Sequence, residues 1–144
     1  MTQVVTNTRL LGEGTFDAIV ERIDIEDGDP DTSKNPNGNH IWKARFVLTP
    51  VDGLGDVIVT KKMAWYGGAA FFSEKIARGI LGADYPQGRL FDDELDRGAC
   101  EGRRVKVKVV PFRTQTGEIN TIDDVMPVQT ERRATRRGMM ETQS

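Results

Sequence analysis

The feature that most constrains the fold is the stretch TFDAIVERIDI at residues 15–25, because its apolar pattern changes phase part-way along. The first half places apolar residues at every second position, and the second half continues the alternation on the opposite parity. The apolar positions are Phe16, Ala18 and Val20, followed by Ile19, Ile23 and Ile25. Period-two alternation indicates a β-strand, and a single change of phase is typical of a β-bulge. A long strand bent in this way can serve two sides of a small barrel.

Two segments after this strand are predicted to form a hairpin. Residues 41–50 alternate cleanly, and residues 56–66 return as a β-branched strand after a turn at 51–55. The side chains expected to point inward are Trp42, Ala44, Phe46, Leu48, Val57, Val59, Met63 and Trp65. This parity leaves Lys61 on the inward side, and a bulge at Lys61/Lys62 is the alternative that would reassign it.

One amphipathic helix is predicted between the third and fourth strands. Gly67-Gly68 ends the third strand, and apolar residues then follow at helical spacing until Gly82. The expected buried stripe consists of Ala69, Phe72, Ile76, Ala77, Ile80 and Leu81. A shorter, acidic helix is expected around 91–98.

A second hairpin completes the pattern, with strands at 103–112 and 118–128 around a turn at 113–117. The order strand, strand, strand, helix, strand, strand is that of the oligonucleotide/oligosaccharide-binding (OB) fold, a partly open Greek-key barrel. We therefore expect a mainly β, five-stranded OB-type barrel with a helix between strands 3 and 4 and a short second helix. The expected organisation is an N-terminal arm at 1–12, the OB-fold domain at 13–128, and a basic, disordered tail at 129–144.

Composition excludes several classes of protein. Cys100 is the only cysteine and cannot form an internal disulfide, and together with the single histidine, His40, it gives no cluster at zinc-ligand spacing. No run approaches the roughly 18 apolar residues of a membrane span, and the start of the chain lacks a secretory signal. We therefore expect a cytoplasmic protein with no membrane partner, no metal and no cofactor. Because neither His40 nor Cys100 has a plausible catalytic neighbour in the sequence, we expect no catalytic residue and no enzyme activity.

The net charge of −2 is distributed unevenly, and positive charge gathers in segments predicted to be strands. Cations that neutralise phosphates and flat rings on which bases stack are the two requirements for binding nucleic acid. The candidate cations are Lys34, Lys43, Arg45, Lys61, Lys62, Lys106, Lys108 and Arg113. The candidate rings are Trp65, Tyr66 and Phe112, with Trp42 assigned to the core. The alternative is that alternating Lys and Val simply marks a half-buried strand that faces water.

The polar loop at 26–40 is rich in Gly, Pro, Asn and Asp, as turns and exposed connections are. Two interpretations stay open for it. In the first, the loop folds over a bound strand, with Lys34 on a phosphate and Asn35, Asn37, Asn39 or His40 on base edges. In the second, it is a solvated connector.

Three motifs carry a resemblance to a known group of proteins. They are GTFDAIVERIDIED, the Trp-Tyr-Gly-Gly unit with a helix ending in Leu-Gly at 65–82, and DDELDRGACEGRRVKVKVVPF. With the strand order, the chain over residues 13–128 resembles small phage-encoded single-stranded DNA-binding proteins with an OB-fold.

The resemblance implies largely sequence-independent binding and protection of single-stranded DNA in phage DNA replication or recombination, in the cytoplasm of the host cell. It also implies replication or recombination proteins as further partners, leaves a homodimer open, and carries over no catalytic residue. A protein-interaction or virion structural module on the same barrel is the alternative function.

Overall fold

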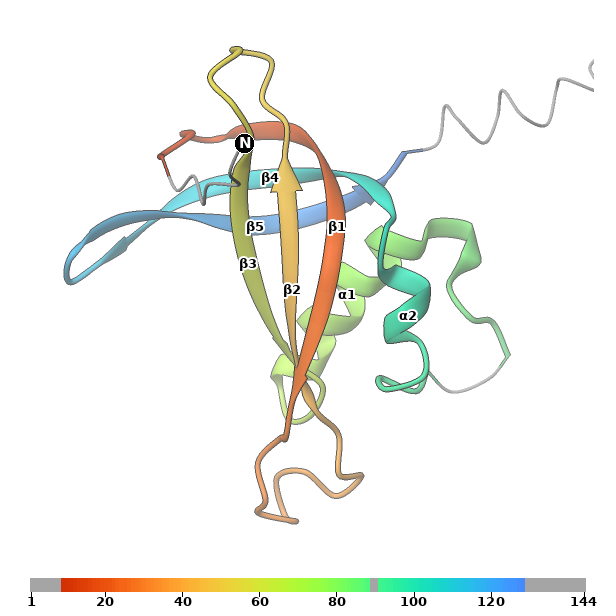
Figure 1. The fold of residues 1–144 in the computed structure, drawn as a ribbon. Helices are drawn as coiled ribbons and strands as arrows, with labels where there is room; N and C mark the ends of the chain where they lie inside the picture. The colour runs from red at the N-terminus through yellow and green to blue at the C-terminus, as the bar shows by residue number, and fades with distance from the viewer. Residues whose placement is uncertain (1–8, 89–90, 129–144) are drawn as a thin grey trace, which may run out of the picture.

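The computed structural model describes residues 9–88 and 91–128, which form a mainly β structure (Figure 1). The strands are β1 (Gly14–Glu26), β2 (Ile41–Leu48), β3 (Val57–Ala64), β4 (Arg104–Thr114) and β5 (Gly117–Pro127). The helices are α1 (Ala69–Leu81), the short 3₁₀ turn η1 (Gly82–Asp84) and α2 (Arg97–Cys100). The predicted element order is confirmed, including the helix between the third and fourth strands.

The strands form one antiparallel sheet in the order β3-β2-β1-β4-β5. β1 is central and pairs with β2 on one side and β4 on the other, while β3 and β5 are the two ends. The sheet curls until β3 and β5 approach each other, and Figure 1 shows β5 passing behind β3. No ladder joins these two strands in the described chain, so the sheet is barrel-like and open along a line that we call the β3–β5 seam.

β1 reaches both sides of the barrel through a bulge. Its pairing with β2 shifts register between Val20 and Arg22, close to the predicted change of phase. Beyond this point β1 no longer pairs with β4, and side chains from α2 and its C-cap take over. Glu101 accepts a hydrogen bond from the Ile23 N–H at 2.7 Å, and Arg97 donates to the Ile23 carbonyl at 2.9 Å. The backbone groups that the bent strand would leave unpaired are therefore satisfied.

The inward parity predicted for β2 and β3 is confirmed. All the apolar side chains assigned to the core on these strands are buried: Trp42, Ala44, Phe46, Leu48, Val57, Val59, Met63 and Trp65. Trp42 and Trp65 pack edge to face, with ring centroids 4.9 Å apart. The β2–β3 register runs without a shift, so the alternative bulge at Lys61/Lys62 is wrong. On β1, Ile19 is 42% exposed, because it precedes the bulge and keeps the outward parity.

α1 begins and ends where the sequence predicts, but its buried stripe is displaced at the first turn. The buried residues are Ser73, Ile76, Ala77, Ile80 and Leu81, and Ala69 and Phe72 are exposed. Ser73 takes the inner position because its hydroxyl donates a 2.6 Å hydrogen bond to the Ala64 carbonyl at the end of β3. The expectation that Ala69 and Phe72 are core residues is therefore wrong.

The second helix is shorter than predicted, covering Arg97–Cys100 instead of 91–98. Aspartates account for the difference, because their carboxylates bond nearby backbone N–H groups and compete with helix formation. Asp92 accepts from the N–H groups of Glu94 and Leu95, each at 3.0 Å. Residues 92–96 therefore form a turn that leads into α2.

The described part of the N-terminal arm is attached to the sheet. The Asn120 side chain on β5 accepts the Leu11 N–H at 2.9 Å and donates to the Arg9 carbonyl at 2.9 Å. The expected tail at 129–144 lies outside the described residues, as do residues 1–8. In the ranges that the structure describes, no helix combines the length and apolar character needed to cross a bilayer.

Gly79 is required where α1 crosses β5. A Cβ at this position would lie 1.9 Å from the Val125 carbonyl oxygen, so the backbone of β5 would have to move. Replacing glycine by alanine inside a helix ordinarily stabilises it by roughly 1 kcal/mol. Here we expect the opposite, a loss of about 1–3 kcal/mol in the free energy of unfolding for Gly79→Ala, measured by urea denaturation.

The matched control is Gly98→Ala in α2, where an added Cβ has no neighbour within 4 Å. This variant should unfold at the same urea concentration as the parent or at a slightly higher one. Equal stability of the two variants would contradict the close packing of α1 on β5.

Candidate nucleic-acid interface

The outer face of β1, β2 and β3 carries predicted cations beside a row of carboxylates. Lys43 on β2 is the register partner of Lys62 on β3. Lys43 also contacts Glu26 at 2.6 Å, and Arg45 contacts Glu21 at 2.6 Å. β1 therefore supplies a carboxylate to each of the two β2 cations.

The Lys43–Glu26 pair is a surface ion pair. Hydrogen bonding to the Lys43 ammonium lowers the pKa of the Glu26 carboxyl, and the charge of Lys62 lowers it further. The same bond raises the pKa of Lys43, so both groups are charged at neutral pH. Water and salt screen an exposed ion pair of this kind, but a phosphate that binds Lys43 must still displace Glu26.

The β4 cations form a second group, separated from β2 by β1 in the sheet. Three of them contact carboxylates: Lys106 with Asp17 at 2.6 Å, Lys108 with Asp123 at 4.0 Å, and Arg113 with Glu118 at 3.3 Å. The predicted strand cations thus fall into two groups, one on β2 and β3 and one on β4.

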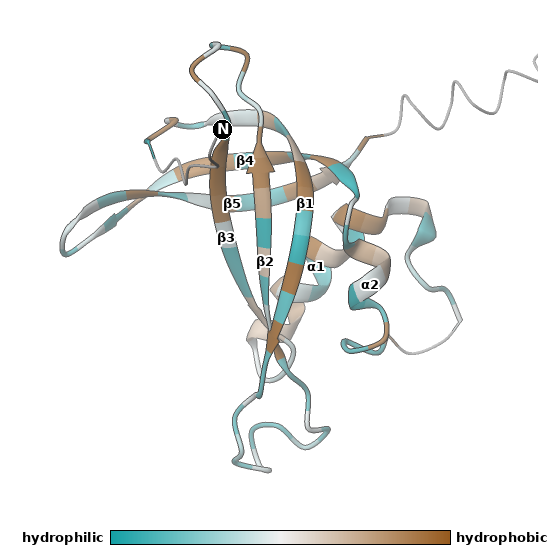
Figure 2. Cartoon of the chain, in the orientation of Figure 1, coloured by the Kyte–Doolittle hydropathy of each residue, from teal (hydrophilic) through white to brown (hydrophobic). Residues whose placement is uncertain are grey.

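A groove of about 220 Å³ lies along the β3–β5 seam where α1 begins. Its charged lining consists of Lys61, Lys62, Lys75 and Asp123. None of the three lysines forms an ion pair with any residue in the described ranges, whereas Asp123 is the partner of Lys108. Figure 2 shows β3 changing from hydrophobic near the β2–β3 loop to hydrophilic toward α1. The seam groove is therefore positive, and its cations are available to a ligand.

Phe72 also lines the seam groove, and 64% of its surface is exposed. Its neighbour Phe71 is 70% exposed and meets it edge to face, with centroids 5.4 Å apart. Neither Phe72 nor Lys75 is among the site residues that the sequence predicts. The helical spacing of Phe72 suggested a core residue, and Lys75 lies on a helix, whereas the prediction drew its cations from strands and loops.

The three predicted stacking rings occupy different places. Trp65 belongs to the core and is 7% exposed. Tyr66 is half-buried beside a separate cleft on the other side of α1. Phe112 is 57% exposed on the β4–β5 hairpin, where it faces Ile119 across the ladder. Phe112 is thus the most exposed of the three predicted rings.

The 26–40 loop is held by its own side chains. The buried Asn35 amide donates to two loop carbonyls, one of them that of Asn39, and accepts the Asn39 N–H at 2.8 Å. The Asn39 amide donates to the Trp65 carbonyl at 2.7 Å, which fixes the loop to the end of β3. The side chains of Lys34 and Asn37 are exposed on the loop and have no hydrogen-bond or ion-pair partner among the described residues, although the Lys34 backbone N–H donates to the Asp31 carbonyl at 3.0 Å.

His40 contacts Asp93, the buried carboxylate of the 92–96 turn. The backbone N–H of His40 donates a 2.7 Å hydrogen bond to Oδ2 of Asp93, and the ring Nδ1 of His40 lies 3.6 Å from the same oxygen. The Asp93 carbonyl in turn accepts the indole N–H of Trp42 at 2.9 Å. These contacts tie the turn to the start of β2. In the described ranges, no group of three or more His, Cys, Asp and Glu side chains is placed to hold a metal ion.

Comparison with known proteins finds no match: no model of a protein family matches the chain, and neither does any curated protein.

Cys100 is fully buried, and loss of hydration raises the pKa of its thiol to about 12. Because the thiolate is the reactive form, native Cys100 should resist alkylation. At about pH 8, near the ordinary pKa of a free thiol, we expect iodoacetamide to leave the native protein unmodified and to label the urea-unfolded protein fully. Mass spectrometry counts the adducts, and labelling at equal rates in both states would contradict the burial.

Proposed function

We propose that the protein binds single-stranded DNA without catalysing a reaction and largely without reading its sequence. The DNA strand lies across β2 and β3 and enters the seam groove. The observation that carries the proposal is the seam groove itself, which is lined by three lysines without ion-pair partners in the described chain and by the exposed ring of Phe72. The OB-type order of the β-strands supports the proposal, since OB-fold barrels bind single-stranded nucleic acid across their second and third β-strands.

The ion-pair pattern ranks the cations. Lys61, Lys62 and Lys75 can meet phosphates directly, whereas Lys43 and Arg45 must first leave Glu26 and Glu21. Phosphate contacts release counterions from the strand, so binding weakens as salt rises. Stacking on Phe72 and Phe112 adds affinity that every base can supply.

For this activity we propose the biological setting that the sequence resemblance implies. A protein that coats unpaired DNA protects it during replication or recombination, here in phage DNA metabolism within the host cytoplasm. Replication or recombination proteins would be its further partners.

A second candidate function is a protein-interaction or virion structural module on the same barrel. The exposed Phe71 and Phe72 favour it, because adjacent exposed rings are also a common element of protein interfaces. The two candidates differ in their response to oligo-dT, which the module would not bind.

The ranking of the cations gives a test on the protein itself. The triple variant Lys61→Gln, Lys62→Gln, Lys75→Gln should bind oligo-dT about tenfold more weakly, or worse, at low salt. The slope of log affinity against log salt concentration should be smaller in magnitude by about 2 for this variant, since each phosphate contact on a single strand contributes about 0.7 to that slope. Fluorescence anisotropy of labelled oligo-dT measures both quantities.

The matched control is Lys43→Gln, Lys106→Gln, Lys108→Gln, which removes the same charge from lysines that have carboxylate partners. Its affinity should fall less than that of the first variant. Equal losses would move the phosphate path away from the seam, and no binding by the parent protein would favour the interaction module.

A further inference from the structure

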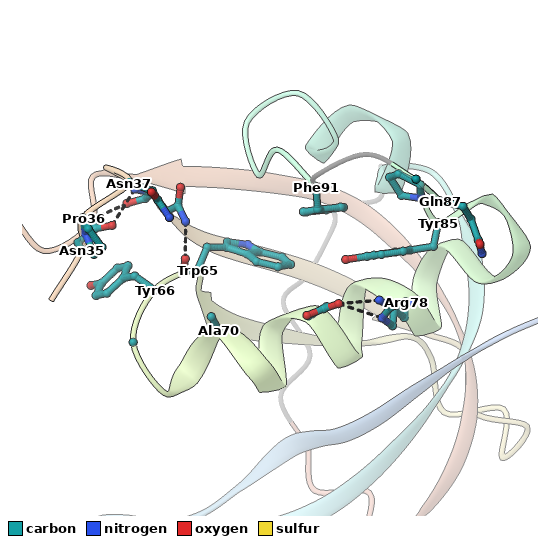
Figure 3. Close-up of a pocket in the computed structure, with 15 residues that line it drawn as sticks. Asn35, Pro36, Asn37, Trp65, Tyr66, Ala70, Arg78, Tyr85, Gln87 and Phe91 are labelled. Atoms are coloured by element: carbon teal, nitrogen blue, oxygen red, sulfur yellow. Dashed lines mark hydrogen bonds and ion pairs between the residues drawn. The ribbon is translucent and has the colours of Figure 1, made fainter.

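A second cavity of about 640 Å³ borders α1 (Figure 3) and opens on the side of the helix opposite to the residues that line the seam groove. Ala69, Phe72 and Lys75 face the groove, whereas Ala70, Glu74 and Arg78 face this second cavity, which we call the α1 cleft. Its other walls are the 26–40 loop, the end of β3 and the segment after α1. A cavity of this size falls in the range of small-molecule sites, about 300–1,000 Å³.

Aromatic rings form one wall of the α1 cleft. Phe91 stacks on Tyr85 with centroids 5.2 Å apart and planes 2° apart, and on Trp65 at 4.9 Å and 26°. The Arg78 guanidinium lies 4.3 Å from the centroid of Tyr85. These contacts hold the wall in place before any ligand arrives, so little ordering is needed on binding.

Tyr66 stands apart from this wall, next to the asparagines of the loop (Figure 3). It is backed by Gly28, where an added Cβ would lie 2.9 Å from the tyrosine ring. No other ring within the described ranges stacks on Tyr66. A flat molecule in the cleft can therefore stack on it.

The polar groups of the α1 cleft suit an uncharged ligand. Glu74 and Arg78 neutralise each other across 2.7 Å, and they are the charged residues of the lining. The amides of Asn37 and Gln87 and the hydroxyl of Tyr66 have no hydrogen-bond partner among the described residues. Free amide and phenol groups beside aromatic faces match a ring that has donors and acceptors on its edge.

We propose that the α1 cleft takes up one unpaired nucleobase of the bound strand. Bases that are splayed out of a strand are recognised in this way, by stacking on aromatic side chains and hydrogen bonding along their edges. The inference rests on the proposed function, since the strand delivers the base. On this proposal the DNA strand leaves the seam groove past the turn that joins β3 to α1, and the exposed Lys34, which precedes the cleft residue Asn35 in the chain, meets the following phosphate.

The two tryptophans supply a spectroscopic readout. Trp65 lines the cleft, and its buried indole N–H has no acceptor in the described chain, whereas the Trp42 indole N–H is bonded to Asp93. In ¹H–¹⁵N spectra of the full chain, thymidine and oligo-dT should each shift the Trp65 indole signal in a saturable way and leave Trp42 nearly unchanged. Tyr66→Ala should weaken oligo-dT binding about tenfold, the order expected for one lost stacking contact.

Phe71→Ala is the matched control, because it removes a ring that is 70% exposed and lines neither site. It should keep the parent affinity. If Tyr66→Ala does not fold, the double variant Asn37→Ala, Gln87→Ala serves instead, since both side chains are exposed. The double variant should lose the thymidine-induced shift of Trp65.

The outcomes separate this inference from the proposed function. Oligo-dT that binds without shifting Trp65, and with equal affinity for parent and Tyr66→Ala, would overturn the base site and leave DNA binding intact. A thymidine-dependent Trp65 shift without any binding of oligo-dT would overturn the proposed function and, with it, delivery of the base by a strand, and would leave the cleft as a site for free nucleosides. Absence of both responses would overturn both.

Discussion

The bulge in β1 is the structural constraint on which the rest of the molecule depends. It lets one strand pair with β4 through its first half and with β2 along most of its length. The sheet can then curl until β5 approaches β3, and α1 packs between them at one end. Glu101 and Arg97 stabilise the bend, because they form hydrogen bonds with the Ile23 backbone where the pairing of β1 with β4 ends. Both cavities follow from this arrangement, since both border α1 where it leaves β3.

Electrostatics then distinguishes the surfaces of the barrel. The faces that look most basic in the sequence are largely neutralised, because carboxylates from β1 and β5 reach the lysines and arginines of β2 and β4. The seam is different: β3 has no strand neighbour there, and Lys61, Lys62 and Lys75 form no ion pair with a described residue, although the charge of Lys62 acts on Glu26. A polyanion gains most from cations that need not leave another partner, and this favours the seam.

Local patterns predicted most of the fold, because alternation and helical spacing record which side of an element is buried. This is why the strands, the β1 bulge and the inward parity of Trp42 and Trp65 could be read from the chain. The misses have tertiary causes. Phe72 is exposed because Ser73 bonds the end of β3, and the second helix is short because aspartates bond the preceding backbone. The sequence carries no periodic signal for the carboxylate that pairs with a given lysine. It carries none for the α1 cleft either, because the walls of the cleft are far apart in sequence.

The location of the bound strand tests the central claim most directly. Oligo-dT carrying 5-bromodeoxyuridine can be cross-linked to the protein by ultraviolet light and the modified peptides identified by mass spectrometry. The account predicts cross-links concentrated in residues 61–75, which contain the seam lysines, Tyr66 and Phe72. Cross-links confined to β4 or to residues 129–144, with none in that segment, would contradict it.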